Sequence, residues 1–176
     1  MAEIRHFSSE EISCVTRTFG HAEKLAGSYF RLTSAGWKDH QYDVKTLSHL
    51  EKHEVNEQAF AQLCKYCTNK SIGDSEERCF YRICLQDNRI LDAVERGSSF
   101  IKLIPLMLYI ATHELVHIFR FNTGESDFEA PLEEKVKEEE KVHVVTKNIL
   151  QPVADREINL VLDCFDDRYH IGDIFN

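Results

Sequence analysis

Apolar residues recur along the chain at two spacings, one typical of helices and one of strands. A spacing of three to four residues, which marks an amphipathic helix, predicts helices over residues 8–30, 55–67, 88–97, 100–121, 131–150 and 153–165. Alternation of apolar and polar residues, which marks a half-buried strand, predicts a strand over residues 78–87, and another is expected to begin within residues 42–50. A few strands followed by a helical second half are typical of the α+β class.

Glycine, serine and proline mark the expected ends of the later helices. Gly97 closes the helix over residues 88–97, as glycine commonly does at a helix C-terminus. Ser98 or Ser99 is expected to cap the following helix, because a serine hydroxyl can accept a hydrogen bond from a free backbone N–H. Pro131 begins the helix over residues 131–150, and Pro152 ends that helix and begins the last one, since proline is tolerated at the start of a helix and breaks its interior.

Composition and charge narrow the class of protein. With 43% hydrophobic residues, the 176-residue chain can bury one core, so we expect a single domain over residues 1–176. The net charge of −9 argues against a nucleic-acid binder, which normally has a basic face, and against attraction to anionic lipid. The first residues lack the apolar run of a secretory signal. We therefore expect a cytoplasmic protein that binds neither nucleic acid nor membrane.

Six cysteines are present, and in the expected cytoplasmic setting their thiols should stay reduced. Cys64 and Cys67 form a C-x-x-C pair, with Cys79 and Cys84 following. Four cysteines could hold zinc or an iron–sulfur cluster. However, Cys79 and Cys84 lie five positions apart in the predicted strand, so their side chains point to opposite faces. We expect that these four cysteines do not bind a metal.

The sequence HELVH, residues 113–117, carries the clearest chemistry in the chain. His113 and His117 share one helix face, so both imidazoles can bind one zinc ion, at about 2.0–2.1 Å. Glu114 lies beside that point, where it can take a proton from a water molecule that zinc activates. The surrounding helix is apolar, and burying these polar groups without partners would be costly. The alternative is a hydrogen-bonded pair of core histidines, with Glu114 at the surface.

HELVH on an apolar helix, behind a strand such as FYRICLQD, resembles the zincin superfamily of zinc metallopeptidases. The resemblance covers residues 78–150. It implies one zinc ion per chain and a peptide or protein substrate. It also implies that the strand before the helix forms a sheet edge, along which the peptide lies. A third ligand is required. The motif form with a third histidine close behind is absent, because Thr123 occupies its last position. The gluzincin form takes a glutamate from the next helix instead.

That next helix offers two glutamates and a histidine. Its expected buried seam consists of Leu132, Val136, Glu139, His143, Thr146 and Leu150. Glu139 and His143 stand where such a seam should be apolar, and Glu140 lies on its flank. Helical phase favours Glu139 over Glu140 as the third ligand, and Glu133, Glu134 and Glu138 are expected on a solvated face. We therefore place the metal site in the helical part, residues 99–176, and regard residues 1–98 as the α+β part.

Three interpretations of His143 remain open. It could be a fourth ligand that closes the site, which would make the chain a non-catalytic metal-binding or interaction protein. It could donate to the oxyanion of a tetrahedral intermediate and so belong to the catalytic residues, or it could orient a ligand from behind. Thermolysin-like gluzincins have an aspartate at this position relative to the ligand glutamate, so His143 departs from the pattern.

A different metal chemistry competes with zinc. Glu114 with His117, and Glu140 with His143, form two E-x-x-H pairs, which di-metal carboxylate bundles use together with further glutamates. Candidates for the additional carboxylates are Glu11, Glu23, Glu57 and Glu157.

Weaker candidates lie near the motif or in the last helix. Tyr109 is expected only to pack. Tyr169 and His170 are possible oxyanion donors. Asp155, Asp163 and Asp166 could each accept the N–H of a ligand histidine.

Overall fold

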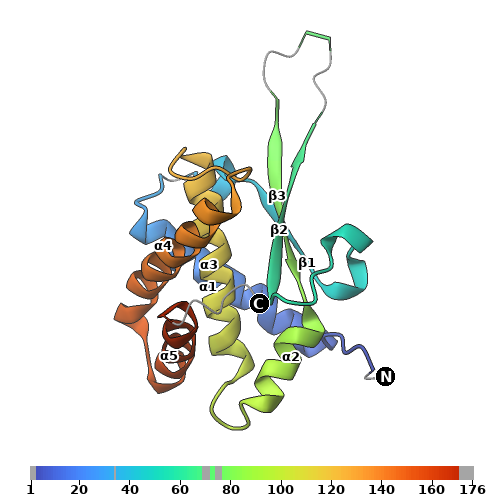
Figure 1. Ribbon diagram of the computed structural model, residues 1–176, viewed down its shortest axis with the longest axis vertical. Coiled ribbons are helices and arrows are strands. Elements are labelled where there is room, and N and C mark those ends of the chain that lie inside the picture. The colour runs from blue at the N-terminus through green and yellow to red at the C-terminus, as the bar shows by residue number, and fades with distance from the viewer. Residues whose placement is uncertain (1–2, 34, 69–71, 74–76, 171–176) are drawn as a thin grey trace.

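The structure, a computed structural model, describes residues 3–33, 35–68, 72–73 and 77–170, with only the backbone for residues 168–170 (Figure 1). Within these ranges the chain folds into five α-helices and a three-stranded sheet. The helices are α1 (Ser9–Tyr29), α2 (Asp87–Arg96), α3 (Leu103–Asn122), α4 (Leu132–Leu150) and α5 (Arg156–His170), and the strands are β1 (Tyr42–Lys45), β2 (Ala61–Cys67) and β3 (Cys79–Leu85). The α+β class is therefore confirmed.

The sheet is mixed, with β3 in its centre. β1 pairs with β3 in parallel, β2 pairs with it in antiparallel orientation, and Ile83 lies opposite both Val44 and Leu63. Alternate residues of a strand point to opposite faces, so Tyr81, Ile83 and Leu85 all face the core, where they are buried. In Figure 1 the β2–β3 hairpin extends beyond the helices.

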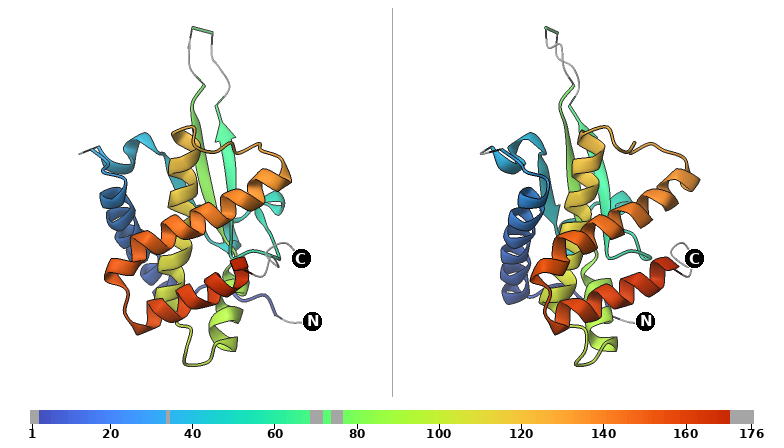
Figure 2. Two further views of the ribbon diagram at one scale, coloured as in Figure 1. Left: turned by 60° about the vertical axis from the view of Figure 1, so that its left-hand side comes forward. Right: turned by 90° about the vertical axis from the view of Figure 1, so that its left-hand side faces the viewer.

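Helix α3 forms the middle of the helical part. Figure 2 shows α1 on one side of α3 and α4 with α5 on the other. Because α3 has neighbours on several sides, it is apolar nearly all round. Its side chains in the main core cluster are Leu106, Met107, Leu108, Tyr109, Ile110, Ala111, Leu115 and Ile118. No helix among the described residues is long and apolar enough to cross a membrane.

One predicted helix is a strand instead. Residues 55–67 were expected to be helical, but they form a turn followed by β2. The pattern fits both periods, because alternation alone also places Ala61 and Leu63 on the core side and Gln62 and Cys64 on the other. Pairing of β2 with β3 along its whole length decides between them, and the local spacing contains no information about that contact.

The expected start of α3 was also wrong. The helix begins at Leu103 with Lys102 as N-cap and has no side-chain cap, whereas Ser98 takes a left-handed φ of 50° in the preceding turn. Pro105 explains the shift. Proline lacks an N–H and is tolerated only in the first helical turn, so a helix that began near Phe100 would have placed it in the interior.

Two further expectations fail in the sheet. Cys67 and Cys79, which face each other across β2 and β3, form a disulfide, so these two thiols are not reduced as expected. The resemblance to zincins also implied that the strand before the motif helix forms the sheet edge. That strand is β3, which lies between β1 and β2.

Candidate metal centre

Helix α3 holds the two histidines of HELVH inside the protein. His113 and His117 are 7% and 6% exposed, and their ring centroids lie 4.9 Å apart. The four-residue spacing places both rings on the same face, one turn apart, and aims both Nε2 atoms at α4. The expected sharing of one face is confirmed.

Helix α4 supplies the carboxylate that meets both rings. Glu139 Oε2 lies 3.0 Å from His113 Nε2, and Glu139 Oε1 lies 3.1 Å from His117 Nε2. The crossing of α3 and α4 is fixed nearby, because Val142 and Ile149 pack against Val116 in a small apolar cluster. The choice of Glu139 over Glu140 follows from helical phase, since Glu140 is exposed.

The three donor atoms suit a zinc ion. Ligands about 2.0–2.1 Å from a tetrahedral zinc lie about 3.4 Å from one another. In the protein the donor atoms of His113, His117 and Glu139 all lie within 4.8 Å of one another, and the two histidine–glutamate separations are slightly shorter than the tetrahedral value. Two imidazole nitrogens with one carboxylate oxygen is also a donor set found in catalytic zinc sites.

The charges of this group are strongly coupled. Burial would raise the pKa of Glu139, but the two imidazoles lower it well below its ordinary range. Burial alone would lower the pKa of His117, but Glu139, with smaller contributions from Glu114 and Glu138, outweighs burial, so the net direction is upward. The carboxylate is therefore an anion that attracts protons, or a cation in their place, to the two Nε2 atoms.

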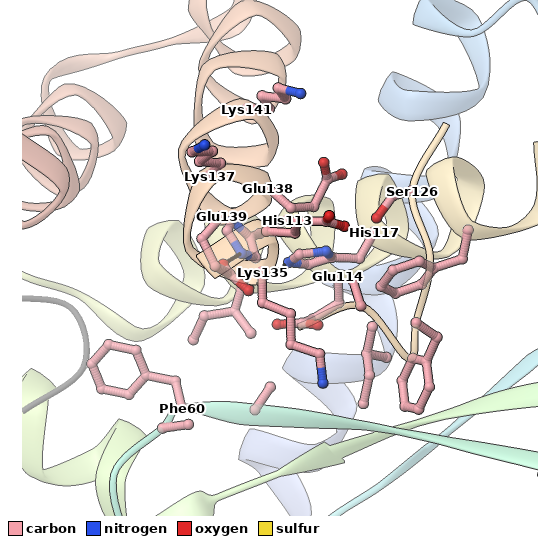
Figure 3. A pocket seen from close by; sticks show the side chains of 18 of the residues that line it. Phe60, His113, Glu114, His117, Ser126, Lys135, Lys137, Glu138, Glu139 and Lys141 are labelled. Carbon is pink, nitrogen blue, oxygen red and sulfur yellow. Dashed lines mark hydrogen bonds and ion pairs between the residues drawn. The ribbon is translucent and has the colours of Figure 1, made fainter. Parts of the chain in front are cut away.

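Glu114 lies beside this group and is not part of it. Burial raises the pKa of Glu114, His113 and His117 oppose that rise, and Glu139 adds to it. A carboxyl with a raised pKa can take up and release a proton closer to neutral pH than an ordinary glutamate can. Figure 3 shows the Glu114 carboxylate next to the three candidate ligands.

A cleft of about 590 Å³ opens in front of these residues. One wall is the HELVH face of α3 with part of α4, and the opposite wall is the start of β2 with the turn before it (Figure 3). Its apolar lining includes Phe60, Ala61, Leu63, Ile110, Phe121, Phe128, Ala130 and Phe165. Lys135, Lys137 and Lys141 line it from α4. The cleft thus has both apolar and charged walls, and its volume lies in the range of sites that bind small molecules.

His143 is turned away from the candidate ligands. Its Nδ1 lies 2.7 Å from Tyr109 Oη, and its Nε2 lies 2.6 Å from Asp166 Oδ1. Both ring nitrogens are thus engaged behind the site, which contradicts His143 as a fourth ligand or as an oxyanion donor in this arrangement. The arrangement fits the third interpretation, in which His143 acts from behind a ligand.

The remaining candidates are dispersed. Asp155 accepts a hydrogen bond from the backbone of Ile158 in α5, and Asp163 is exposed. The side chains of Tyr169 and His170 lie outside the described residues. In the di-metal alternative, Glu11 caps α1, Glu23 binds Tyr42, Glu157 pairs with Lys102, and Glu57 and Glu140 are exposed. The described part of the chain does not gather them around Glu114.

Glu138 differs from the expectation that it is solvated. It is 9% exposed and binds the Arg120 guanidinium through both carboxylate oxygens. Because Arg120 also bonds to Glu125 at 2.8 Å, it ties the end of α3 to α4 and to the loop between them. This network holds the α3–α4 pair together one turn beyond His117.

A second group of possible ligands lies on the opposite face of the sheet. It consists of Glu54, Cys64 and Cys84. Glu54 is fully buried, and its Oε2 accepts from Tyr66 at 2.7 Å and from Arg82 at 3.1 Å. Burial opposes ionisation of Glu54, but these donors and a backbone N–H lower its pKa to about 2. Burial raises the pKa of Cys84. The Glu54 carboxylate is thus already paired with the Arg82 cation, and burial disfavours the thiolate form of Cys84, which is the form that binds metals.

One contribution was missed from the sequence, and another was left undecided. Tyr109, expected only to pack, bridges His113 and His143; its position four residues before His113 was an available signal. The choice of Asp166 among three aspartates depends on how α5 docks, for which the sequence contains no local signal.

Comparison with known proteins gives no match: no family model fits the chain, and no curated protein or solved structure is significantly similar to it.

Proposed function

We propose that the chain is a zinc-dependent hydrolase of zincin type that cleaves peptide bonds, with His113, His117 and Glu139 as ligands of one zinc ion. The observation that carries the proposal is the meeting of Glu139 with both Nε2 atoms on the wall of a cleft, at 3.0 and 3.1 Å. A purely structural pair of core histidines would not need to face a cleft of about 590 Å³.

The orientation of His143, whose ring nitrogens point away from the candidate ligands, favours a catalytic site over a closed one. A structural zinc site takes four protein ligands, whereas a catalytic one takes three and keeps a position for water or substrate. Because both nitrogens of His143 are bonded to Tyr109 and Asp166, three protein ligands remain at this place among the described residues. This count supports an open position facing the cleft.

The residues then divide the chemistry between them. Zinc would supply a Lewis acid that polarises the scissile carbonyl and lowers the pKa of water. Glu114 would accept a proton from the attacking water and pass it to the leaving amine, a role that its raised pKa favours. The apolar residues on the β2 side of the cleft, Phe60, Ala61 and Leu63, would exclude bulk water there, which strengthens these electrostatic effects.

The sheet offers a place for an extended peptide. Within the described residues β2 pairs only with β3, so its outer edge is unpaired, and its first residues border the cleft. A peptide can bind to such an edge through backbone hydrogen bonds. The peptide backbone would then lie opposite the HELVH face of α3.

The test compares zinc-loaded wild type with Glu114→Gln. A peptide library of mixed sequence is incubated with each protein, and mass spectrometry counts new termini, with bound zinc measured in the same samples. We expect wild type to cleave and Glu114→Gln to cleave about 100- to 10,000-fold more slowly, the usual contribution of a general base, with zinc retained.

Two results would contradict the proposal in different ways. Cleavage by neither protein, with one zinc bound to each, would reduce the function to metal binding. Release of zinc from Glu114→Gln would make Glu114 a ligand and return the E-x-x-H carboxylate site to consideration.

A further inference from the structure

A chain of hydrogen bonds runs from the back of His113 to α5. Tyr109 Oη lies 3.4 Å from His113 Nδ1 and 2.7 Å from His143 Nδ1. Asp166 follows, with Oδ1 at 2.6 Å from His143 Nε2 and Oδ2 at 2.6 Å from Lys147 Nζ. Tyr109 and His143 are only 2% and 4% exposed, so the middle of this chain is shielded from water.

Donors and acceptors along this chain match in one direction. The Asp166 carboxylate can only accept, so His143 Nε2 must carry a proton. Burial lowers the pKa of His143 and Asp166 opposes that shift, with a net downward direction; together with the bond from Nε2 to Asp166, this favours a neutral ring whose Nδ1 is an acceptor. The hydroxyl proton of Tyr109 then goes to His143 Nδ1, and the Tyr109 oxygen accepts from the Nδ1–H of His113.

With its proton on Nδ1, His113 can bind a metal through Nε2. Neutral histidine binds zinc through its unprotonated ring nitrogen. The hydrogen-bond partner of the protonated nitrogen decides which of the two nitrogens binds the metal. Nε2 is the atom that faces Glu139, at 3.0 Å.

The second histidine has no comparable arrangement. His117 Nδ1 is buried and has no hydrogen-bond partner among the residues that the structure describes. The ring of His117 is held by packing, including a stack on Phe121 with ring centroids 5.7 Å apart. The hydrogen-bond chain therefore acts on one of the two histidines.

We infer that Tyr109, His143 and Asp166 are positioning residues of the metal centre, which hold His113 in its Nδ1–H tautomer with Nε2 toward Glu139. The inference rests on the proposed zinc site. It explains why a histidine, His143, occupies a buried position on α4. It assigns no contact with substrate to any of the three residues.

Tyr109→Phe tests this with little effect on packing. The Tyr109 ring stacks on Phe165 with centroids 3.9 Å apart, and phenylalanine keeps that stack while removing the hydroxyl. Tyr42→Phe is the matched control, because the Tyr42 hydroxyl also makes a side-chain hydrogen bond, to Glu23, and neither residue lines the cleft. Competition with a chromophoric chelator should show zinc binding about 10- to 100-fold weaker in Tyr109→Phe and unchanged in Tyr42→Phe.

A spectroscopic measurement separates positioning from a general structural role. In zinc-loaded protein with ¹⁵N-labelled histidine, NMR should show a slowly exchanging proton on His113 Nδ1 that exchanges rapidly in Tyr109→Phe. Asp166→Ala, which removes the last acceptor in this series of hydrogen bonds, should also weaken zinc binding. Thermal melts of the metal-free variants confirm that each one is folded.

The outcomes separate this inference from the proposed function. If wild type binds no zinc, the proposed function fails and this inference fails with it. If wild type binds zinc and Tyr109→Phe binds it equally tightly with the Nδ1 proton still protected, this inference alone is overturned. A proton on Nδ1 of His143 would also overturn this inference, because His143 would then donate to Tyr109 instead of accepting its hydroxyl proton.

Discussion

Three consecutive glutamates of α4 have three different roles, and this contrast defines the site at the scale of single residues. Glu138 binds Arg120, Glu139 meets His113 and His117, and Glu140 is exposed. Successive residues of an α-helix point about 100° apart, so only one of the three can face a given neighbour. Helical phase thus selects Glu139 as the third candidate ligand.

Substitution of the two neighbouring glutamates tests that selection. Glu139→Gln replaces a charged ligand oxygen by a weaker neutral one, so zinc affinity should fall by more than the roughly 10- to 100-fold cost of losing a group behind the ligands. Glu140→Gln makes the same chemical change at an exposed position and should leave affinity unaltered. Equal losses in both variants, measured by chelator competition, would show that the third ligand is misassigned.

Sequence patterns could single out the candidate ligands but could not choose among the residues behind them. The four-residue spacing of His113 and His117 and the phase of Glu139 are properties of a single helix, which a sequence expresses directly. The contact between His143 and Asp166 joins α4 to α5, and it depends on how two helices dock. For the same reason, the burial of Glu138 against Arg120 was not predicted.

At the scale of elements, the candidate site joins two helices that a short apolar cluster already holds together. His113 and His117 belong to α3 and Glu139 to α4, and Val116 packs against Val142 and Ile149 beside them. A metal bound by all three ligands would tie α3 to α4. Such a metal binds the folded chain better than the unfolded one and so stabilises the fold.

Removal of the metal should therefore lower the melting temperature. If zinc is present at about 1,000 times its dissociation constant, it adds about 4 kcal/mol to the free energy of unfolding, and each kcal/mol is worth about 2–4 °C for a chain of this length. A chelator should lower the melting temperature of wild type accordingly and leave that of His117→Ala unchanged. If the melting temperature of wild type does not change although loss of zinc is demonstrated, a stabilising metal link between α3 and α4 is disproved.

Periodicity predicted the long elements and failed where two periods coincide. Helix α4 and strand β3 have one dominant spacing each and α3 is a long, nearly all-apolar segment, and each was found close to its expected position. The segment that became β2 satisfies both the helical and the strand pattern, so pairing with β3 decides its structure. The start of α3 was misplaced because a serine pair resembles a cap, whereas Pro105 restricts where the helix can begin.

At the scale of the whole molecule, the site lies where the sheet meets the helical part. The HELVH face of α3 and part of α4 form one wall of the cleft, and the start of β2 forms the other (Figure 3). The opposite face of the sheet carries the Glu54, Cys64 and Cys84 group, which is satisfied by ion pairing and hydrogen bonds. The architecture thus contains one group of donors suited to zinc that also opens onto a cleft, among the parts of the chain that the structure describes.

The most direct test of this account is the metal content of protein purified without added metal or a metal-binding tag, measured by inductively coupled plasma mass spectrometry. We predict about one zinc per chain in wild type, the same content in a Cys64→Ser/Cys84→Ser variant, and none in a His113→Ala/His117→Ala variant. No metal in wild type would favour a pair of hydrogen-bonded core histidines, and two irons per chain would favour a carboxylate di-metal site. Zinc that persists without the histidines and disappears without the cysteines would contradict the account altogether.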